Sequence, residues 1–286
     1  DEKGRTMFCA TTADLTERMR EVLWDNGKPM LLTSGTLAVK DDFTRFKEEA
    51  GLIGSTRLKE SVSLSPFDYK KNCLLYIPET VPKRNTEDMK AYYAELAREI
   101  AALLEITHGH ALVLFTAYSA MAAVKELLAE YLLPSPIFTM SRNAMHTVEQ
   151  FKESNSGILL ATGSAWEGFD FPGDTVSALI IPRLPFATPD AISNEKQKQY
   201  SSLKDFIRAV AVPDMQIKLK QGFGRAIRLE TDTCVVALLD ERVTRGRRYR
   251  QAAKNALPDM RQTNNIDTVA DFLRSVKPES YYAEVE

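Results

Sequence analysis

The sequence has 286 residues, of which 44% are hydrophobic and 27% are charged. A chain of this length and apolar content can bury a core that supports one large domain or two small ones, which excludes a disordered protein. The 37 Lys and Arg residues nearly balance the 39 Asp and Glu residues, so any nucleic-acid site must be local and not a property of the whole surface.

Cysteine spacing and hydropathy bear on metal sites and location. Cys9, Cys73 and Cys234 lie too far apart in sequence for a zinc or iron–sulfur pattern. No uninterrupted apolar run approaches the roughly 20 residues that span a bilayer, and no secretory core follows the first residues. We therefore expect a soluble, cytoplasmic protein with no metal site of its own and no membrane partner.

Short apolar runs alternate with longer amphipathic stretches, which is typical of strand–helix–strand units. The predicted strands cover residues 73–77, 111–116, 136–139, 158–162, 178–181 and 235–239, and the predicted helices cover residues 87–106, 120–132, 214–229, 242–256 and 267–276. The β-branched and aliphatic content of the strands suits burial on both faces. The predicted class is α/β, with a mostly parallel central sheet flanked by helices, and a boundary between two structural units is expected near residue 50.

The most informative segment reads QGFGRAIR and begins at Gln221. The apolar residues of this predicted helix recur every four positions, so Gln221, Arg225 and Arg228 should project together from another face. Arginine pairs bidentately with phosphate oxygens and keeps its charge, which favours a phosphate site over an ordinary solvated face. Gly222 and Gly224 each cost about 0.5–1 kcal/mol against Ala inside a helix, which indicates that something approaches the backbone closely.

A second segment is the turn after the predicted strand that ends at Thr162. Ligands bind at the carboxyl ends of strands in open α/β sheets, so Thr162 and Ser164 are candidates to hold phosphodiester oxygens. Because carboxylates repel a nucleic-acid backbone, Glu167 and Asp170 should order neighbouring arginines, touch a nucleotide sugar or lie near its magnesium. The alternative is a tight structural turn with Trp166 in the core.

Two weaker segments place hydroxyl groups after apolar runs. One contains Thr33 and Ser34. The other ends a predicted strand with Thr116, Tyr118 and Ser119, where Ser119 is expected to cap the following helix. Neither segment identifies a function by itself.

Together these four segments, in this order, resemble motifs III, IV, V and VI of DinG-like helicases, which are relatives of XPD in superfamily 2. The resemblance spans most of the chain, and motifs V and VI are the specific ones. It implies a RecA-like fold in which two motor domains clamp ATP between them. Residues 51–286 would form the second motor domain, and residues 1–50 would be the trailing segment of the first, with motif III.

The resemblance also implies roles for single residues. Arg228 resembles the arginine finger, and Gln221 and Arg225 resemble supporting contacts to the nucleotide phosphates. The residues implied to lie near the nucleotide are Glu167, Gly168, Asp170 and Gly224, and those implied to contact single-stranded DNA are Thr116, Tyr118, Thr162, Ser164 and Trp166. Thr33 and Ser34 would couple the nucleotide state to the grip on DNA.

The phosphate-binding loop of an ATPase is missing from the sequence. No Gly-x-x-x-x-Gly-Lys-Ser/Thr occurs, and Pro29 follows the sole Gly-Lys pair. Asp240 and Glu241 follow an apolar run as in a Walker B strand, but the resemblance implies an aspartate there without that role. We therefore expect ATP and Mg²⁺ to be bound mainly by a first motor domain upstream in the same polypeptide, and this chain alone to be inactive.

The predicted function is the C-terminal motor domain of an ATP-dependent DNA helicase that translocates on single-stranded DNA and unwinds duplexes, with DNA repair as its setting. The alternative is a standalone nucleic-acid-binding module that senses nucleotides without hydrolysis. A third reading, an unrelated phosphotransferase or Rossmann enzyme, has little support because Ile227 replaces the third glycine of the dinucleotide pattern.

Overall fold

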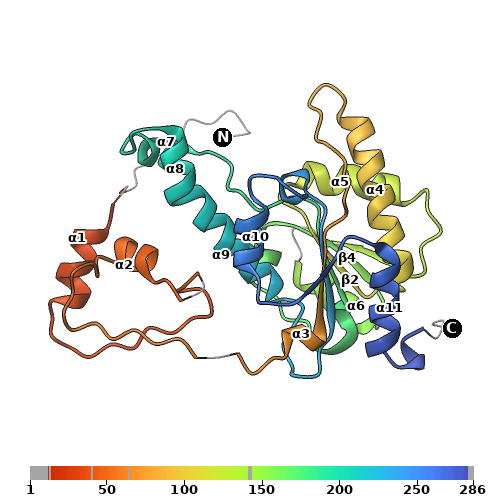
Figure 1. Ribbon diagram of the computed structural model, residues 1–286, viewed down its shortest axis with the longest axis horizontal. Coiled ribbons are helices and arrows are strands. Elements are labelled where there is room, and N and C mark those ends of the chain that lie inside the picture. The colour runs from red at the N-terminus through yellow and green to blue at the C-terminus, as the bar shows by residue number, and fades with distance from the viewer. Residues whose placement is uncertain (1–11, 13, 40, 64, 141–143, 283–286) are drawn as a thin grey trace. The chain divides into compact units, whose positions relative to one another are not determined.

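The computed structural model describes residue 12 and residues 14–39, 41–63, 65–140 and 144–282. The chain divides into two compact units (Figure 1). Unit 1 comprises Asp1–Ser63 and Ala187–Pro213, and unit 2 comprises Leu64–Phe186 and Asp214–Glu286. This division rests on contacts within the fold, so the assignment of residues 1–50 to a first motor domain stays a prediction. Cys9 lies outside the described residues.

Unit 2 contains a seven-stranded sheet in the order β3-β4-β2-β5-β6-β1-β7, and all of its strand pairs are parallel. Its strands are β1 Cys73–Tyr76, β2 Ala111–Leu114, β3 Ile137–Thr139, β4 Ile158–Ala161, β5 Ala178–Ile181, β6 Cys234–Leu238 and β7 Arg261–Thr263. The predicted α/β class and all six predicted strands are confirmed. The edge strand β7 was not predicted because it is short, polar and largely exposed.

The helices of unit 2 connect these strands. They are α3 Tyr69–Asn72, α4 Met89–Ile106, α5 Tyr118–Leu128, α6 Ala144–Glu153, α9 Val212–Phe223, α10 Arg250–Ala256 and α11 Ile266–Val276, where the first two residues of α9 belong to unit 1. α4 and α11 begin after Asp88 and Asn265, whose side chains accept backbone N–H bonds from the first turn. The predicted helix over residues 242–256 begins only at Arg250, because a turn with positive φ at Gly246 precedes it.

The helices of unit 1 are short. They are α1 Thr16–Met19, α2 Thr44–Ala50, α7 Ala191–Gln197 and α8 Leu203–Phe206, with π-helical turns at Arg20–Trp24 and Ile207–Ala211. Side chains that donate to backbone carbonyls connect distant parts of this unit: Trp24 Nε1 donates to Ala50 O at 2.6 Å and Arg45 Nη1 donates to Val210 O at 2.8 Å. Hydrogen bonds therefore supplement a small apolar interior.

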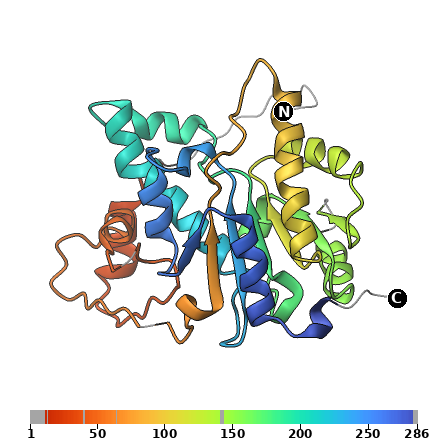
Figure 2. The ribbon, with the colours of Figure 1, turned by 45° about the vertical axis from the view of Figure 1, so that its right-hand side comes forward.

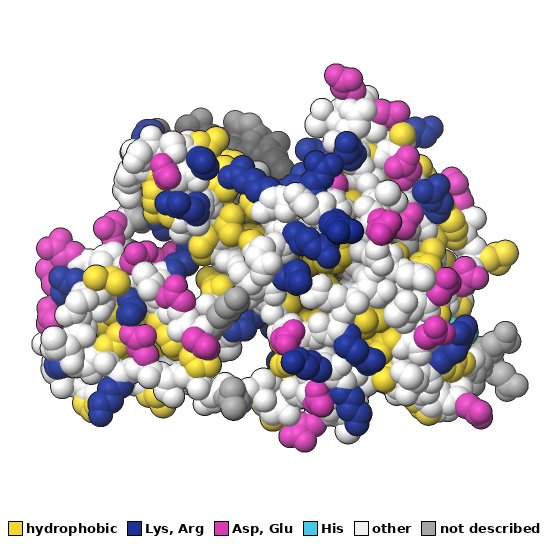
Figure 3. All heavy atoms as spheres, viewed as in Figure 1, with side chains coloured by type: hydrophobic (Ala, Val, Ile, Leu, Met, Phe, Trp, Pro, Cys, Tyr) yellow, Lys and Arg dark blue, Asp and Glu magenta, His cyan; other side chains and the backbone are white. Residues whose placement is uncertain are grey.

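The surface is mixed in charge. Lys, Arg, Asp and Glu side chains all occur on the face seen in Figure 3, in line with the near balance of charges in the sequence. Within the part of the chain that the structure describes, no helix combines the length and apolar character needed to cross a membrane.

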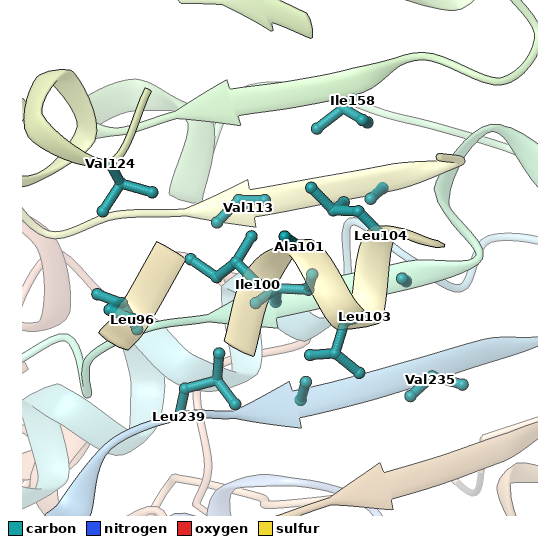
Figure 4. Close-up of a cluster of buried hydrophobic side chains, with 14 of the residues drawn as sticks. Leu96, Ile100, Ala101, Leu103, Leu104, Val113, Val124, Ile158, Val235 and Leu239 are labelled. Atoms are coloured by element: carbon teal, nitrogen blue, oxygen red, sulfur yellow. The ribbon is translucent and has the colours of Figure 1, made fainter. Parts of the chain in front are cut away.

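The main core lies between the sheet and a layer formed by α4, α5 and α11 (Figures 1 and 2). α4 places Leu96, Ile100 and Leu104 one above the other on its buried face. They pack over alternate residues of the strands, among them Val113 and Ile158 (Figure 4). Each large apolar side chain buried in this way contributes about 1.5–3 kcal/mol, so this layer fixes the sheet.

Two cysteines that are remote in sequence lie side by side in the sheet. Cys73 of β1 and Cys234 of β6 are register partners, and both are buried free thiols. Burial raises the pKa of Cys73 to about 12 and also raises that of Cys234. The two thiols therefore stay protonated and act as small apolar side chains.

Replacing the fully buried Ile100 by alanine should lower the free energy of unfolding by about 2–5 kcal/mol, because it leaves a cavity between α4 and the sheet. Leu132→Ala is the matched control, since that side chain is fully exposed and its loss should cost under about 0.5 kcal/mol. Chemical denaturation followed by circular dichroism measures both. Equal stability of the two variants would contradict this description of the core.

Candidate functional site

Exposed hydroxyl groups gather where β2 and β4 end. These neighbouring strands end in register, with Leu114 opposite Ala161, so the segments that follow them lie side by side. Thr116 and Tyr118 follow β2, Ser164 follows β4, and all three are exposed. We call these three residues the hydroxyl edge. Its groups face solvent at the carboxyl ends of parallel strands, where ligands bind in folds of this class.

Gly163 and Tyr118 lie against each other within this region. Gly163 has φ +63°, and a Cβ added there would lie 3.6 Å from Tyr118 Oη. The N-cap of α5 is Ala117, which makes no side-chain capping bond, so the expectation that Ser119 caps this helix is wrong. Ser119 lies one residue inside the helix and is exposed.

Trp166 belongs to the core and not to the exposed surface. Its side chain is 1% exposed, and its indole N–H donates to Phe115 O at 2.9 Å. A buried ring whose one donor is used has nothing left to offer a nucleic acid, so the predicted DNA contact by Trp166 is corrected to a positioning role. Thr162 is also buried, at 2% exposure, which leaves Ser164 as the exposed hydroxyl of this turn.

The close approach predicted from the two glycines exists at Gly222, and the approaching group is Trp166. A Cβ on Gly222 would lie 2.8 Å from two carbons of the Trp166 ring and 3.2 Å from Leu114 Cδ1. Gly224 differs, because a Cβ there would meet only carbonyl oxygens of its own turn, the nearest being that of Gln221 at 3.3 Å. A glycine at 222 is thus explained by packing and not by a ligand.

The arginines lie in a turn beyond α9, whose last residue is Phe223. The helix predicted to continue to residue 229 ends early, because the following amides bond to carbonyls three residues back instead of four. Arg225 N donates to Gly222 O in this way. The amides of Arg228 and Leu229 then donate to Asp232 Oδ2 at 2.7 and 2.8 Å. The expected single helical face of Gln221, Arg225 and Arg228 is therefore wrong. We call residues 224–228 the arginine turn.

Each guanidinium of the arginine turn has a partner. Arg225 donates to Phe169 O through Nη1 and to Gln221 O through Nε. Burial, and then the neighbouring Arg228 charge, lower the pKa of Arg225. Arg228 Nε forms an ion pair with Asp170 Oδ1, although the two groups do not align as a hydrogen bond. Asp170 thus orders a neighbouring arginine, the first of the three roles considered for it.

This ion pair is only partly shielded from water. The side chains of Arg228 and Asp170 are 34% and 61% exposed. Solvent screens such a pair, so it contributes at most about 1 kcal/mol. A ligand with more negative charge can displace the carboxylate at small cost. Glu167 and Gly168 are exposed in the same segment, while Gln221 and Gly224 are half-buried beside the arginines.

Asp232 was not identified from the sequence, although it positions the arginine turn. Its carboxylate is 2% exposed and accepts from Gly173 N at 3.0 Å as well as from the amides of Arg228 and Leu229. It therefore joins the segment that leads into β6 to the segment that leads into β5. Asp232 stands alone between two threonines in the sequence, so no spacing pattern distinguishes it.

Asp240 is occupied within the protein. Its buried carboxylate accepts from Leu184 N at 2.8 Å and from Arg242, whose Nη2 lies 2.6 Å away. The carboxylate oxygens are therefore already saturated by donors. Among the described residues, no group of three or more His, Cys, Asp or Glu side chains is arranged to hold a metal ion. Where Mg²⁺ binds stays a prediction.

Thr33 and Ser34 lie in an exposed loop of unit 1. Ser34 Oγ accepts from Thr36 N at 3.2 Å and lies 3.1 Å from Thr36 Oγ1, which holds the loop in a local turn. Their coupling role stays a prediction.

The sequence matches the family of helicase C-terminal domains over residues 100–260. ATP-dependent DNA helicase YoaA of Haemophilus influenzae is 32% identical over a region that covers 86% of this chain and 38% of that protein. ATP-dependent helicase DinG of Mycobacterium tuberculosis is 32% identical over 85% of this chain and 37% of that protein. The chain thus spans about two fifths of these curated relatives. The solved structure named XPD_Helicase has a TM-score of 0.58 over 88% of this chain and 45% of its own, at 18% identity. The predicted RecA-like fold is confirmed.

Gly222→Ala should destabilise unit 2 by about 1–3 kcal/mol, because the added methyl group pushes on the Trp166 ring. This loss exceeds the about 0.5–1 kcal/mol that alanine gains over glycine in a helix. Gly35→Ala is the control, since its added Cβ would meet no described atom within 4 Å apart from those of its chain neighbours. Chemical denaturation measures both variants, and a stabilised Gly222→Ala protein would refute the packing role of this glycine.

Proposed function

This chain belongs to the family of helicase C-terminal domains, and we propose that it is the second RecA-like motor domain of an ATP-dependent DNA helicase. In this proposal the complete protein couples ATP hydrolysis to movement along single-stranded DNA and to duplex unwinding. The observation that carries it is the arginine turn, where two guanidinium groups are fixed by the protein itself and one is partly exposed. We extend the proposal, on family grounds alone, to a cytoplasmic role in DNA repair.

Arg228 is the proposed arginine finger. Its backbone amide is fixed by Asp232 and its side chain rests against the exposed Asp170. A triphosphate carries more charge than one carboxylate, and the guanidinium fork matches its oxygens, so exchange of partners favours the nucleotide. Arg225, held by Phe169 O, supports the positive potential without leaving its own partners. ATP with Mg²⁺ supplies the phosphoryl group for hydrolysis, and an upstream motor domain would bind most of it.

The hydroxyl edge is the proposed contact to single-stranded DNA. Thr116, Tyr118 and Ser164 offer exposed donors at one sheet edge, and hydroxyl groups commonly bind phosphate oxygens. Trp166 keeps this edge and the arginine turn in one packed unit, because it contacts Phe115 and Gly222 at once. This packing supports the proposal that both ligand sites share one rigid scaffold.

An apolar run in unit 1 supports an upstream partner domain. Met30, Leu31 and Leu32 follow one another and are 45%, 88% and 43% exposed. Exposing three adjacent apolar side chains to water is unfavourable, and a continuous apolar run of this kind is typical of a buried strand. We propose that the rest of that domain, in a longer polypeptide, covers this run.

Arg228→Ala in the complete protein should reduce ATP turnover by about 10³–10⁵-fold, the range known for arginine fingers, while DNA affinity stays the same. Arg274→Ala is the control, because that arginine is exposed on α11 and forms a surface ion pair with Asp271. Steady-state ATP hydrolysis with saturating single-stranded DNA measures the effect. Unchanged turnover would exclude the finger, and Arg228-dependent hydrolysis by the 286-residue chain alone would mean that a complete nucleotide site exists here.

Leu31→Ala should change the stability of this chain by less than about 0.5 kcal/mol, since the side chain is 88% exposed. In the longer protein the same substitution should cost about 2–5 kcal/mol, because the proposed first domain buries it. Leu132→Ala, also exposed here, should be neutral in both proteins. Thermal and chemical unfolding of both lengths gives the comparison, and a neutral Leu31→Ala in the longer protein would argue against this covering domain.

A further inference from the structure

A loop between β6 and α10 concentrates positive charge. Residues 241–250, here called the arginine loop, read ERVTRGRRYR and contain five arginines. On the face seen in Figure 3, Lys and Arg side chains gather where this loop and α10 lie. The net charge of the whole chain is near zero, so this concentration of arginines is a local feature of the surface. The composition requires any nucleic-acid site to be local in this sense.

Two of these arginines are used by the fold. Arg242 is paired with the buried Asp240, and Arg250 Nη1 donates to Val243 O at 3.0 Å. Arg245, Arg247 and Arg248 are exposed, and within the described residues none of the three has an acidic partner. Three like charges within four positions repel one another, so they do not stabilise the loop.

The loop is nevertheless well anchored. The Arg242 guanidinium lies 4.8 Å from the Phe186 ring centre, the Phe186 and Tyr249 rings are 4.9 Å apart, and the Arg248 guanidinium lies 5.2 Å from the Tyr249 ring. Backbone bonds from Arg247 N to Thr244 O and from Tyr249 N to Arg242 O close the turn. This stack presents Arg248 from a fixed base.

A hollow opens between the anchored and the exposed arginines. It has a volume of about 430 Å³ and is lined by Glu241, Arg242, Gly246, Arg247, Arg248 and Tyr249. The lining offers planar guanidinium groups that match phosphate oxygens. The Tyr249 ring already packs against Phe186 and Arg248. Positive charge is therefore the main feature that a ligand would recognise here.

The position of the loop indicates which polyanion it meets. Because all strands are parallel, β6 ends at the same sheet edge as β2 and β4, and only β5 separates it from β2. Strands lie about 4.8 Å apart, so the loop begins about 10 Å along the edge from the hydroxyl edge. That interval is roughly three nucleotides at the about 3.4 Å spacing of one strand in a duplex, and fewer when the strand is extended.

We propose that Arg245, Arg247 and Arg248 bind the phosphodiester backbone of single-stranded nucleic acid, as a second contact beside the hydroxyl edge. The choice of ligand rests on the proposed function, while the site rests on the charge, the anchored stack and the position of the loop. A strand held by both contacts would run along the carboxyl edge of the sheet, from β4 and β2 toward β6.

The test is fluorescence anisotropy of a labelled oligothymidylate with the 286-residue chain, without ATP, over a range of salt. The double variant Arg247→Glu, Arg248→Glu should bind about 10- to 30-fold more weakly at ~0.1 M salt, and the slope of log affinity against log salt should fall by about 1.4, or 0.7 per lost phosphate contact. The matched control is Arg98→Glu with Arg274→Glu, which makes the same charge change at two other exposed arginines of unit 2.

Equal weakening in the test and control variants would overturn the proposal, because it would reduce the effect to net charge. So would an oligoglutamate that binds the loop as tightly as the oligothymidylate, which would identify an acidic protein segment as the ligand. Arg247→Gln, Arg248→Gln, with an unchanged circular dichroism spectrum, separates lost contact from misfolding. This binding test does not depend on ATP turnover, so failure of the arginine-finger assignment would not change its result. Conversely, normal turnover in the Arg228 experiment would not conceal a loop that fails to bind the oligothymidylate.

Discussion

The indole of Trp166 lies where three segments meet that carry residues of the candidate site. Its N–H donates to Phe115 O at the end of β2, its own backbone follows β4, and its ring fills the space that Gly222 leaves on α9. The ring is large, rigid and fully buried, so neighbouring segments cannot shift independently around it. The hydroxyl edge after β2 and β4 and the arginine turn after α9 thereby share one support.

The arginine turn combines a rigid backbone with exchangeable side-chain partners. Asp232 is buried and fixes the amides of Arg228 and Leu229, whereas Asp170 meets the Arg228 side chain in partial contact with water. The two carboxylates therefore differ in consequence: loss of the buried one leaves unsatisfied amides, while the exposed one yields easily to a stronger anion. Under the proposed function, Arg228 engages the nucleotide during only part of the hydrolysis cycle, and a fixed backbone with an exchangeable side-chain partner suits that role. The fold keeps Arg228 in place, and the weak ion pair keeps it available.

The sequence is informative where burial dominates and less so where single polar contacts decide. Five of the six predicted strands, β1, β2, β4, β5 and β6, are apolar runs whose residues are all buried in the parallel sheet. The edge strand β3 is only partly buried but is still apolar enough to be predicted, whereas the other edge strand, β7, is polar and was missed. The end of α9 was missed because the amides of Arg225 and Ala226 bond three residues back and Asp232 then accepts the amides of Arg228 and Leu229. No periodicity of the sequence indicates these contacts. The residues of motifs V and VI were identified by resemblance, but their geometry was not. The contact between Trp166 and Gly222 accounts for both residues, and it is visible only in the folded structure.

Under the proposed function, this domain acts together with a partner domain. The arginine turn can contribute charge to a phosphate, but the sequence contains no phosphate-binding loop. Asp240, the first of the two carboxylates that follow β6 as in a Walker B strand, is already saturated by Arg242 and Leu184. The exposed run at Met30, Leu31 and Leu32 gives the same indication from unit 1. Under the proposed function, splitting the nucleotide site between two domains makes hydrolysis depend on their closure, so that chemistry and movement along a strand become one event. An arginine such as Arg228, whose backbone is fixed by Asp232 and whose side chain is only weakly paired with Asp170, suits such a division.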